Sequence, residues 1–126
     1  MFRLRDFILD TGLGRIRGSA GEGYHIFRGI PYAVTERFEY PVPIDCWDSE
    51  LDATGEELNC WQYSAFNDES KDENSFYYNE FRPGQVFRYA ESPMTINIIT
   101  PENPENCPVL IFIHGGGHET GTVGEL

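Results

Sequence analysis

The sequence predicts an α/β fold that is rich in strands in this chain, with antiparallel strands near the amino terminus leading into a central sheet. The apolar run Val109–Ile113 does not alternate with polar residues, which is typical of a strand covered on both faces in a parallel sheet. Turn signals separate short segments in the first 44 residues. Only two Met and five Ala occur among 126 residues, which argues against a fold of helices alone.

The first part of the chain is expected to contain three short strands. Residues 3–9 alternate weakly between apolar and polar side chains, and the turn signal Asp10-Thr11-Gly12 follows them. The second strand is predicted over Gly14–Gly18 and the third over Tyr24–Arg28. Pro31 is expected to end the third strand, because proline cannot donate a hydrogen bond within a sheet.

Charge distinguishes a middle segment from the rest of the chain. Residues 45–80 hold 11 of the 21 acidic residues, so we expect a solvated surface region, with short helices around Glu56–Tyr63 and Ser75–Phe81. Downstream, the many β-branched residues in Met94–Thr100 predict a strand, which precedes the apolar run Val109–Ile113.

The net charge of −12 excludes two classes of partner. Nucleic acids and anionic membranes both require clustered basic side chains, so we expect no nucleic acid and no membrane partner. The beginning of the sequence lacks the apolar run of a signal peptide. Cys46, Cys60 and Cys107 have the spacing of neither a metal site nor a dense disulfide framework. We therefore expect a reducing, cytoplasmic location and no bound metal.

Three glycines follow the apolar run, in His114-Gly115-Gly116-Gly117. Glycine costs backbone entropy, and taken alone this triplet favours a flexible loop. A glycine-rich turn at the carboxyl end of a buried strand, however, can direct several N–H groups toward one negatively charged oxygen. With a buried strand and His114 before it, the triplet is interpreted as an oxyanion hole, like the His-Gly-Gly-Gly motif of lipases and esterases.

Several short blocks, each weak alone, occur in a specific order and spacing. They are Gly14-Arg15-Ile16-Arg17-Gly18, Phe27-Arg28-Gly29-Ile30-Pro31-Tyr32-Ala33, Arg37-Phe38, Trp47, Asp52-Ala53-Thr54-Gly55, Cys60-Trp61-Gln62, Ile96-Asn97-Ile98 and the segment from Pro108 to Gly117. In these blocks the chain resembles the amino-terminal part of a type B carboxylesterase, in the carboxylesterase and cholinesterase branch of the α/β-hydrolases. The resemblance implies an incomplete α/β-hydrolase fold, with residues 1–126 forming part of one carboxylesterase domain.

The resemblance also implies roles for individual residues. Gly116 and Gly117 would supply the two oxyanion-hole N–H groups, Gly115 would allow the turn and His114 would brace it. The implied substrate is a carboxylic ester, and no cofactor is implied.

Two structural features of the family can be transferred to this chain or tested against it. An ion pair is implied between Arg37 and Glu91. The family often joins the Cys at the position of Cys60 to a Cys just before the Asn97 strand. Here Pro93 occupies that second position, so this disulfide cannot form, which agrees with the cytoplasmic location.

The chain lacks the other parts of a serine esterase site. Such an enzyme needs a Ser in Gly-x-Ser-x-Gly, a His base and an acid, and the closest string here, Gly18-Ser19-Ala20-Gly21, has the wrong spacing. In the family these groups lie downstream, so we expect an amino-terminal fragment of a serine carboxylesterase that is inactive alone. The alternative is a non-catalytic binding or adhesion-type member, or an inactive remnant. The isolated fragment is expected to self-associate through its unpaired apolar strand.

The remaining polar residues receive simpler interpretations. His25 is expected to be a strand residue and not a catalytic base. His118 is either a pocket-lining residue or an ordinary loop residue. An acidic cluster lacks the Gly and the distal Glu of a calcium loop and is expected to be solvated. Its members are Asp45, Asp48, Glu50 and Asp52.

Overall fold

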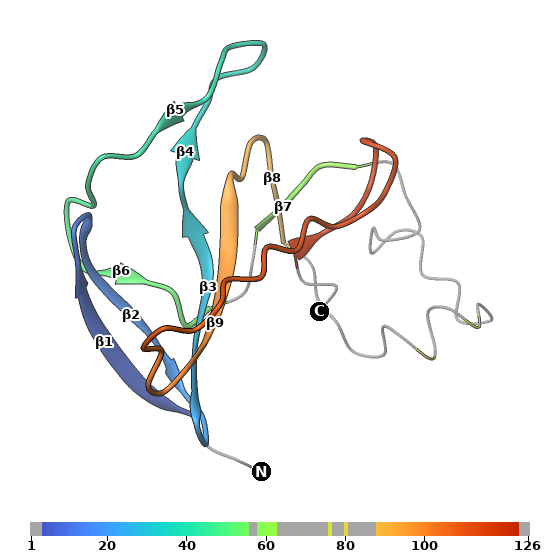
Figure 1. Ribbon diagram of the computed structural model, residues 1–126. Helices are drawn as coiled ribbons and strands as arrows, with labels where there is room; N and C mark the ends of the chain where they lie inside the picture. Colours follow the sequence, from blue (N-terminus) through green and yellow to red (C-terminus); the bar gives the residue numbers. More distant parts are fainter. Residues whose placement is uncertain (1–3, 56–57, 63–75, 77–79, 81–87, 124–126) are drawn as a thin grey trace.

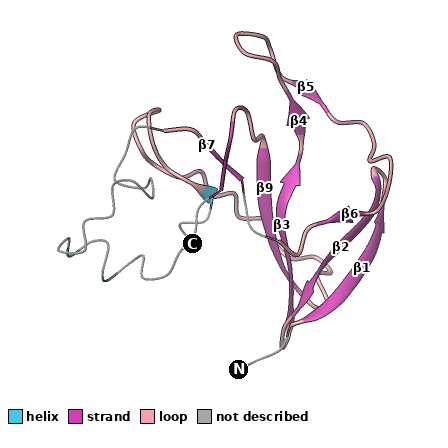
Figure 2. Cartoon of the chain, turned by 180° about the vertical axis from the view of Figure 1, so that it is seen from behind, coloured by secondary structure: helices cyan, strands magenta, loops and turns pink. Residues whose placement is uncertain are grey.

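Strands form nearly all of the regular structure. The computed structural model describes residues 4–55, 58–62, 76, 80 and 88–123. The strands in these residues are β1 (Arg5–Thr11), β2 (Gly14–Ala20), β3 (Tyr24–Pro31), β4 (Ala33–Val34), β5 (Val42–Pro43), β6 (Leu51–Asp52), β7 (Leu58–Cys60), β8 (Arg88–Ala90) and β9 (Thr95–Pro101). The main sheet has the order β1-β2-β3-β9 with β6 beside β2, and β4–β5 and β7–β8 form two separate pairs (Figures 1 and 2).

The hairpin of β1 and β2 is the most regular part of the sheet. Its antiparallel register extends from Arg5 opposite Ala20 to Thr11 opposite Gly14. The Thr11 hydroxyl donates to the Gly14 carbonyl at 2.7 Å and accepts from the Leu13 N–H at 3.1 Å, so one side chain closes the turn. Both strands were predicted, but Asp10 and Thr11 belong to β1 and not to the turn, because the loop contains only two residues.

The third strand is longer than the sequence predicts. It pairs antiparallel with β9, and the register shifts between Phe27 and Ile30. Gly29 has a φ of 66°, which is a conformation that glycine adopts without strain. This β-bulge lets pairing resume, so Pro31 lies opposite Thr95 as the last residue of β3. The strand thus ends at Pro31, as predicted, but it extends three residues beyond the predicted range Tyr24–Arg28, because a missing N–H is tolerated at the end of a strand.

Ala53 hydrogen-bonds to both β2 and β3 at the point where these two strands no longer pair directly. The direct pairing of these strands covers Ser19 and Ala20. Farther along, the Ala53 N–H donates to the Arg17 carbonyl at 2.7 Å, and the Ala53 carbonyl accepts from the Arg28 N–H at 2.8 Å. Ala53 is only 1% exposed. It lies in a small core with Ile16, Phe27 and Ile30, against which Phe7, Trp47 and Leu51 pack.

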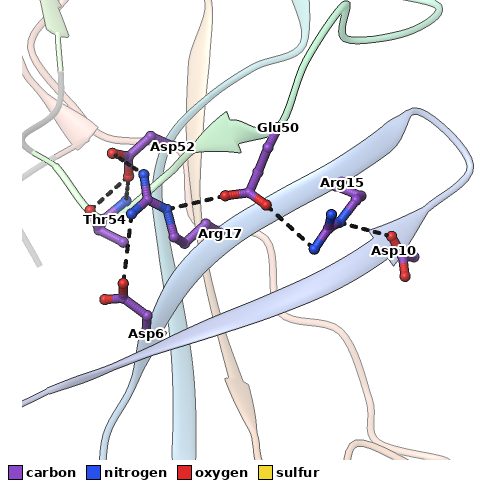
Figure 3. A network of polar contacts seen from close by, with 7 residues as sticks. All are labelled: Asp6, Asp10, Arg15, Arg17, Glu50, Asp52 and Thr54. Atoms are coloured by element: carbon purple, nitrogen blue, oxygen red, sulfur yellow. Dashed lines mark hydrogen bonds and ion pairs between the residues drawn. The ribbon is translucent and has the colours of Figure 1, made fainter.

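A polar network lies over the same strands (Figure 3). An Arg17 Nη2 atom lies 2.9 Å from Asp52 Oδ2, and Arg17 Nε lies 3.4 Å from Glu50 Oε1. Arg15 Nη2 contacts the other oxygen of Glu50 at 3.5 Å. Asp52 also accepts hydrogen bonds from the Thr54 hydroxyl and N–H, at 2.7 and 3.1 Å. These contacts attach the segment around β6 to the β1–β2 hairpin.

The apolar run Val109–Ile113 is not a strand in this structure, which corrects the prediction. Its five side chains are 58–94% exposed, and none of its residues belongs to a strand. A central parallel strand needs hydrogen-bonding neighbours and covered faces. The part of the chain that the structure describes places no strand beside this run, so the run remains irregular and uncovered.

The helices predicted in the acidic middle segment lie mostly outside the described residues. Within the first of them, Leu58–Cys60 forms β7, which pairs in parallel with β8, so that prediction is wrong over these residues. Within the second, Phe76 and Glu80 are helical. Among the residues that are described, no helix is long and apolar enough to cross a membrane.

Candidate functional site

The candidate site is the glycine loop, defined as His114–Val123. It follows the apolar run and lies outside the strands. Gly116, Gly117 and His118 are consecutive residues with φ values of 124°, 64° and 65°, and Gly121 has a φ of 112°. Side chains rarely adopt such values, which explains why three of these four positions are glycine. The glycines therefore produce a specific backbone shape.

Gly116 is fixed by a turn that closes on its carbonyl group. The N–H groups of Glu119 and Thr120 both donate to the Gly116 carbonyl at 3.1 Å, and the Thr120 hydroxyl donates to it at 3.2 Å. A Cβ atom at Gly116 would overlap the carbonyl of Thr120. This position therefore requires glycine for space as well as for its φ value.

The N–H groups of Gly116 and Gly117 remain available to a ligand. Within the ranges that the structure describes, no protein acceptor is hydrogen-bonded to either group. A Cβ atom built at Gly115 or at Gly117 would meet no atom within 4 Å. Two neighbouring donors beside open space can hydrogen-bond an oxygen that carries negative charge.

His114 contacts the loop that follows it. Its Nδ1 lies 2.9 Å from the Gly115 carbonyl, a distance at which the Nδ1–H tautomer donates a hydrogen bond. A Cβ atom at Gly121 would overlap both His114 Nδ1 and the Gly115 carbonyl. The two ends of the loop thus pack closely against each other at His114, Gly115 and Gly121.

Side-chain amides from distant strands hold the second half of the loop. Gln62 accepts from the Gly121 N–H at 2.9 Å and donates to the Gly121 carbonyl at 3.0 Å. Asn97 donates to the Val123 carbonyl at 3.4 Å, and its oxygen accepts from the Gly29 N–H at 2.9 Å.

The Thr122 hydroxyl also donates to the Asn59 side-chain oxygen, and both residues are buried. Sequence reasoning assigned no role to any of these amides, although Gln62 and Asn97 lie in the blocks that define the resemblance. The sequence feature that could indicate such a role is an amide side chain between apolar residues of a predicted strand, as in Ile96-Asn97-Ile98.

The other residues named from the sequence lie apart from the loop's hydrogen bonds. The structure brings Arg37 and Glu91 together, with Arg37 Nε 2.5 Å from Glu91 Oε1 and both side chains more than half exposed. His25 is buried in β3 and its ring stacks on Phe7 at 3.6 Å between centroids. His118 is an exposed loop residue.

The described cysteines and acidic side chains form no further site. Cys46, Cys60 and Cys107 are all exposed free thiols. Glu50 and Asp52 pair with arginines. Across the described part of the chain, no three His, Cys, Asp or Glu side chains are grouped as metal ligands.

Comparison with known proteins identifies the relatives of this chain. The para-nitrobenzyl esterase of Bacillus subtilis (strain 168) is 32% identical over 123 residues, which cover 94% of this chain and 23% of that protein. The acetylcholinesterase of Leptinotarsa decemlineata is 32% identical over 143 residues, covering 96% of this chain and 22% of that protein. The chain thus spans less than a quarter of the length of these relatives.

Structural comparison gives the same result. A solved PNB esterase superimposes with a TM-score of 0.69 at 30% identity, over 94% of this chain and 23% of that structure. This similarity confirms the α/β-hydrolase fold class, with a strand-rich portion in this chain. Residues 5–125 match the sequence profile of the carboxylesterase family. The chain therefore belongs to the carboxylesterase family.

Proposed function

We propose that this chain supplies the oxyanion hole of a carboxylic ester hydrolase that works through an acyl-serine intermediate. One observation carries the proposal. The N–H groups of Gly116 and Gly117 are adjacent and have no acceptor among the described residues, and a Cβ atom built at Gly115 or Gly117 meets nothing within 4 Å beyond its chain neighbours. The relatives bear the names of esterases and a cholinesterase, and hydrolysis of an ester passes through an intermediate with a negatively charged oxygen.

In the proposed reaction a serine oxygen attacks the ester carbonyl carbon. The electron pair of the carbonyl double bond moves to its oxygen, and the Gly116 and Gly117 N–H groups donate to that oxygen. The base takes the proton of the serine hydroxyl during this attack and gives it to the alcohol, which leaves as the electron pair returns and the acyl-serine forms. Water then attacks the acyl-serine in the same way, which releases the carboxylic acid and returns the proton to the serine. Because the turn around Gly116 holds the donors in place before reaction, little reorganisation is needed in the transition state.

The proposed serine, acid and base come from sequence other than these 126 residues. No Gly-x-Ser-x-Gly string occurs in the chain. We therefore propose that the isolated chain is inactive and that the complete enzyme acts on carboxylic esters. We also propose that it needs no cofactor and is cytoplasmic, the latter supported by the three free thiols of the chain.

A chimeric enzyme tests the function of the loop. Residues 5–125 replace the matching segment of the Bacillus subtilis para-nitrobenzyl esterase, and the hydrolysis of p-nitrophenyl esters is measured. We expect turnover in the chimera and none from the isolated chain. A folded chimera without turnover contradicts the proposal and supports the non-catalytic alternative.

Substitution of Gly117 tests the donors directly. In the chimera, Gly117→Ala places a methyl group in the open space and strains a residue with a φ of 64°. The backbone N–H remains, but we expect the strain and the added methyl group to move it away from the oxyanion, so that kcat falls by up to about 10²–10³-fold, the usual cost of losing one oxyanion donor. Gly116 is a poorer test site, because a side chain there overlaps Thr120 and disrupts the turn itself. Gly12→Ala, in the distant hairpin turn, is the matched control. Equal kcat values for the two variants contradict the assignment.

A further inference from the structure

The glycine loop depends on side chains for its attachment to the strands. Its internal backbone hydrogen bonds end on Gly116. The contacts that connect it to other segments come from side chains that follow or lie within β7 and β9, through Gln62, Asn59 and Asn97. We propose that Gln62 is a positioning residue that holds the Gly115–Gly117 backbone in its donor geometry. The inference rests on the proposed function of the loop.

Gln62 makes the most complete of these contacts. Its amide oxygen and amide nitrogen bind the N–H and the carbonyl of the same residue, Gly121, at 2.9 and 3.0 Å. Two hydrogen bonds to one residue fix both its position and the orientation of its flanking peptide groups. The contact is half-buried, so competition from water is reduced.

Gly121 influences the donor residues Gly116 and Gly117 in two ways, by packing against the preceding residue Gly115 and through the backbone. By direct packing, the α-carbon of Gly121 lies so close to the Gly115 carbonyl and to His114 Nδ1 that a methyl group would not fit. Along the backbone, Gly121 follows Thr120, whose N–H and hydroxyl both donate to the Gly116 carbonyl. A shift of Gly121 therefore displaces Gly115 on one side and Gly116 on the other.

The remaining anchors do not replace Gln62. Asn97 binds the Val123 carbonyl at 3.4 Å, and Asn59 binds the Thr122 hydroxyl. Both partners lie beyond Gly121 in the sequence, on the side away from the donors. They hold the end of the loop, whereas Gln62 holds the residue that packs against Gly115.

The test uses the 126-residue chain with Gln62→Met, which keeps the approximate length of the side chain and removes both hydrogen bonds to Gly121, together with the one that Gln62 donates to the Cys60 carbonyl at 3.3 Å. Gln62→Glu is the second variant; it keeps an acceptor for the Gly121 N–H and loses the donor to the Gly121 carbonyl. Cys60→Ser is the matched control, since it alters an exposed side chain of the same segment.

Two measurements report on the loop. Glutamyl endopeptidase cleaves after Glu119 when the loop opens, and cleavage after Glu22 reports on the β2–β3 turn in the same sample. Loss of the Gln62 contacts is expected to accelerate cleavage at Glu119 about tenfold or more and to leave Glu22 unchanged. In spectra of protein labelled with ¹⁵N-glycine, we expect the Gly116 and Gly117 signals to move in both variants and those of Gly12 and Gly23 to stay in place.

Changes confined to Gly121, with Gly116 and Gly117 unmoved, would overturn the inference and leave Gln62 as a local contact. Unchanged cleavage at Glu119 in both variants would also overturn it. These measurements do not involve catalysis. If only the proposed function were wrong, the Gly117→Ala and Gly12→Ala chimeras would have equal kcat values. The Gly116 and Gly117 signals of the 126-residue chain would still move when Gln62 is replaced.

Discussion

Asp52 illustrates how one residue joins separate parts of the chain. Hydrogen bonds from Thr54, and to a smaller extent the charge of Arg17, lower the pKa of the Asp52 carboxyl below its ordinary value of 3.8. The same carboxylate contacts Arg17 Nη2 at 2.9 Å. The ionised form is therefore favoured in the folded chain, although the side chain is exposed.

This lowered pKa predicts a pH dependence of stability. A carboxyl group whose pKa is lower when folded stabilises the fold fully above its ordinary pKa, and this contribution is lost as the pH falls through the lowered value. We expect Asp52→Asn to be less stable than the wild type at pH 7. The difference between their free energies of unfolding should narrow as the pH falls below about 3.8. Urea unfolding followed by tryptophan fluorescence measures this free energy for both proteins. A difference that is constant with pH would contradict the expectation.

Single residues of the site were only partly predictable. Gly115–Gly117 are found from their position after an apolar run, because glycine triplets are costly and need a structural reason. The role of Gln62 cannot be found in this way. Its partner, Gly121, is 59 residues away, and no local pattern specifies which backbone group a distant amide will bind.

At the scale of elements, β2 packs closely against β3. A Cβ atom at Gly18 would lie 2.7 Å from the Ile26 carbonyl and would overlap the Phe27 ring. We expect Gly18→Ala to lower the free energy of unfolding by about 1–3 kcal/mol, as is typical of overpacking. The control is Gly12→Ala, where a Cβ atom meets nothing within 4 Å, and its effect should stay within about 0.5 kcal/mol. Thermal unfolding compares the two, and equal stabilities would refute the close packing.

Elements stabilised by local patterns were predicted better than elements that depend on distant partners. The β1–β2 hairpin follows from alternation and a short turn, and it is present with small shifts in its ends. By contrast, β7 forms because Leu58–Cys60 pairs with a strand 30 residues downstream. The bulge that extends β3 likewise depends on Asn97, whose side chain receives the Gly29 N–H. Neither partner can be read from the local sequence.

At the scale of the whole molecule, the run Val109–Ile113 is an uncovered apolar segment. Five consecutive apolar side chains, each at least 58% exposed, form an uncovered segment. Such a segment pairs readily with another chain, because its backbone groups and its apolar side chains are both available. We propose that the isolated chain self-associates through this run.

Sedimentation velocity tests this proposal. We expect the wild type to sediment faster than a 14.4 kDa monomer and Ile111→Lys to shift the distribution toward the monomer. Tyr40→Lys adds the same charge at a side chain that is 91% exposed and lies outside the run, so it should leave association unchanged. A monomeric wild type, or equal effects of the two substitutions, would refute the proposal.

The hydrogen bonds of Ala53 have a consequence for the length of the chain. Residues 32–50 leave the main sheet after β3 and return to it at β6, and Ala53, which follows β6, binds both Arg17 and Arg28. They form a closed loop whose ends are fixed independently of its length. Doubling such a loop costs only roughly 0.6 kcal/mol of closure entropy. The exposed part of this segment can therefore lengthen without moving the points where it joins the sheet.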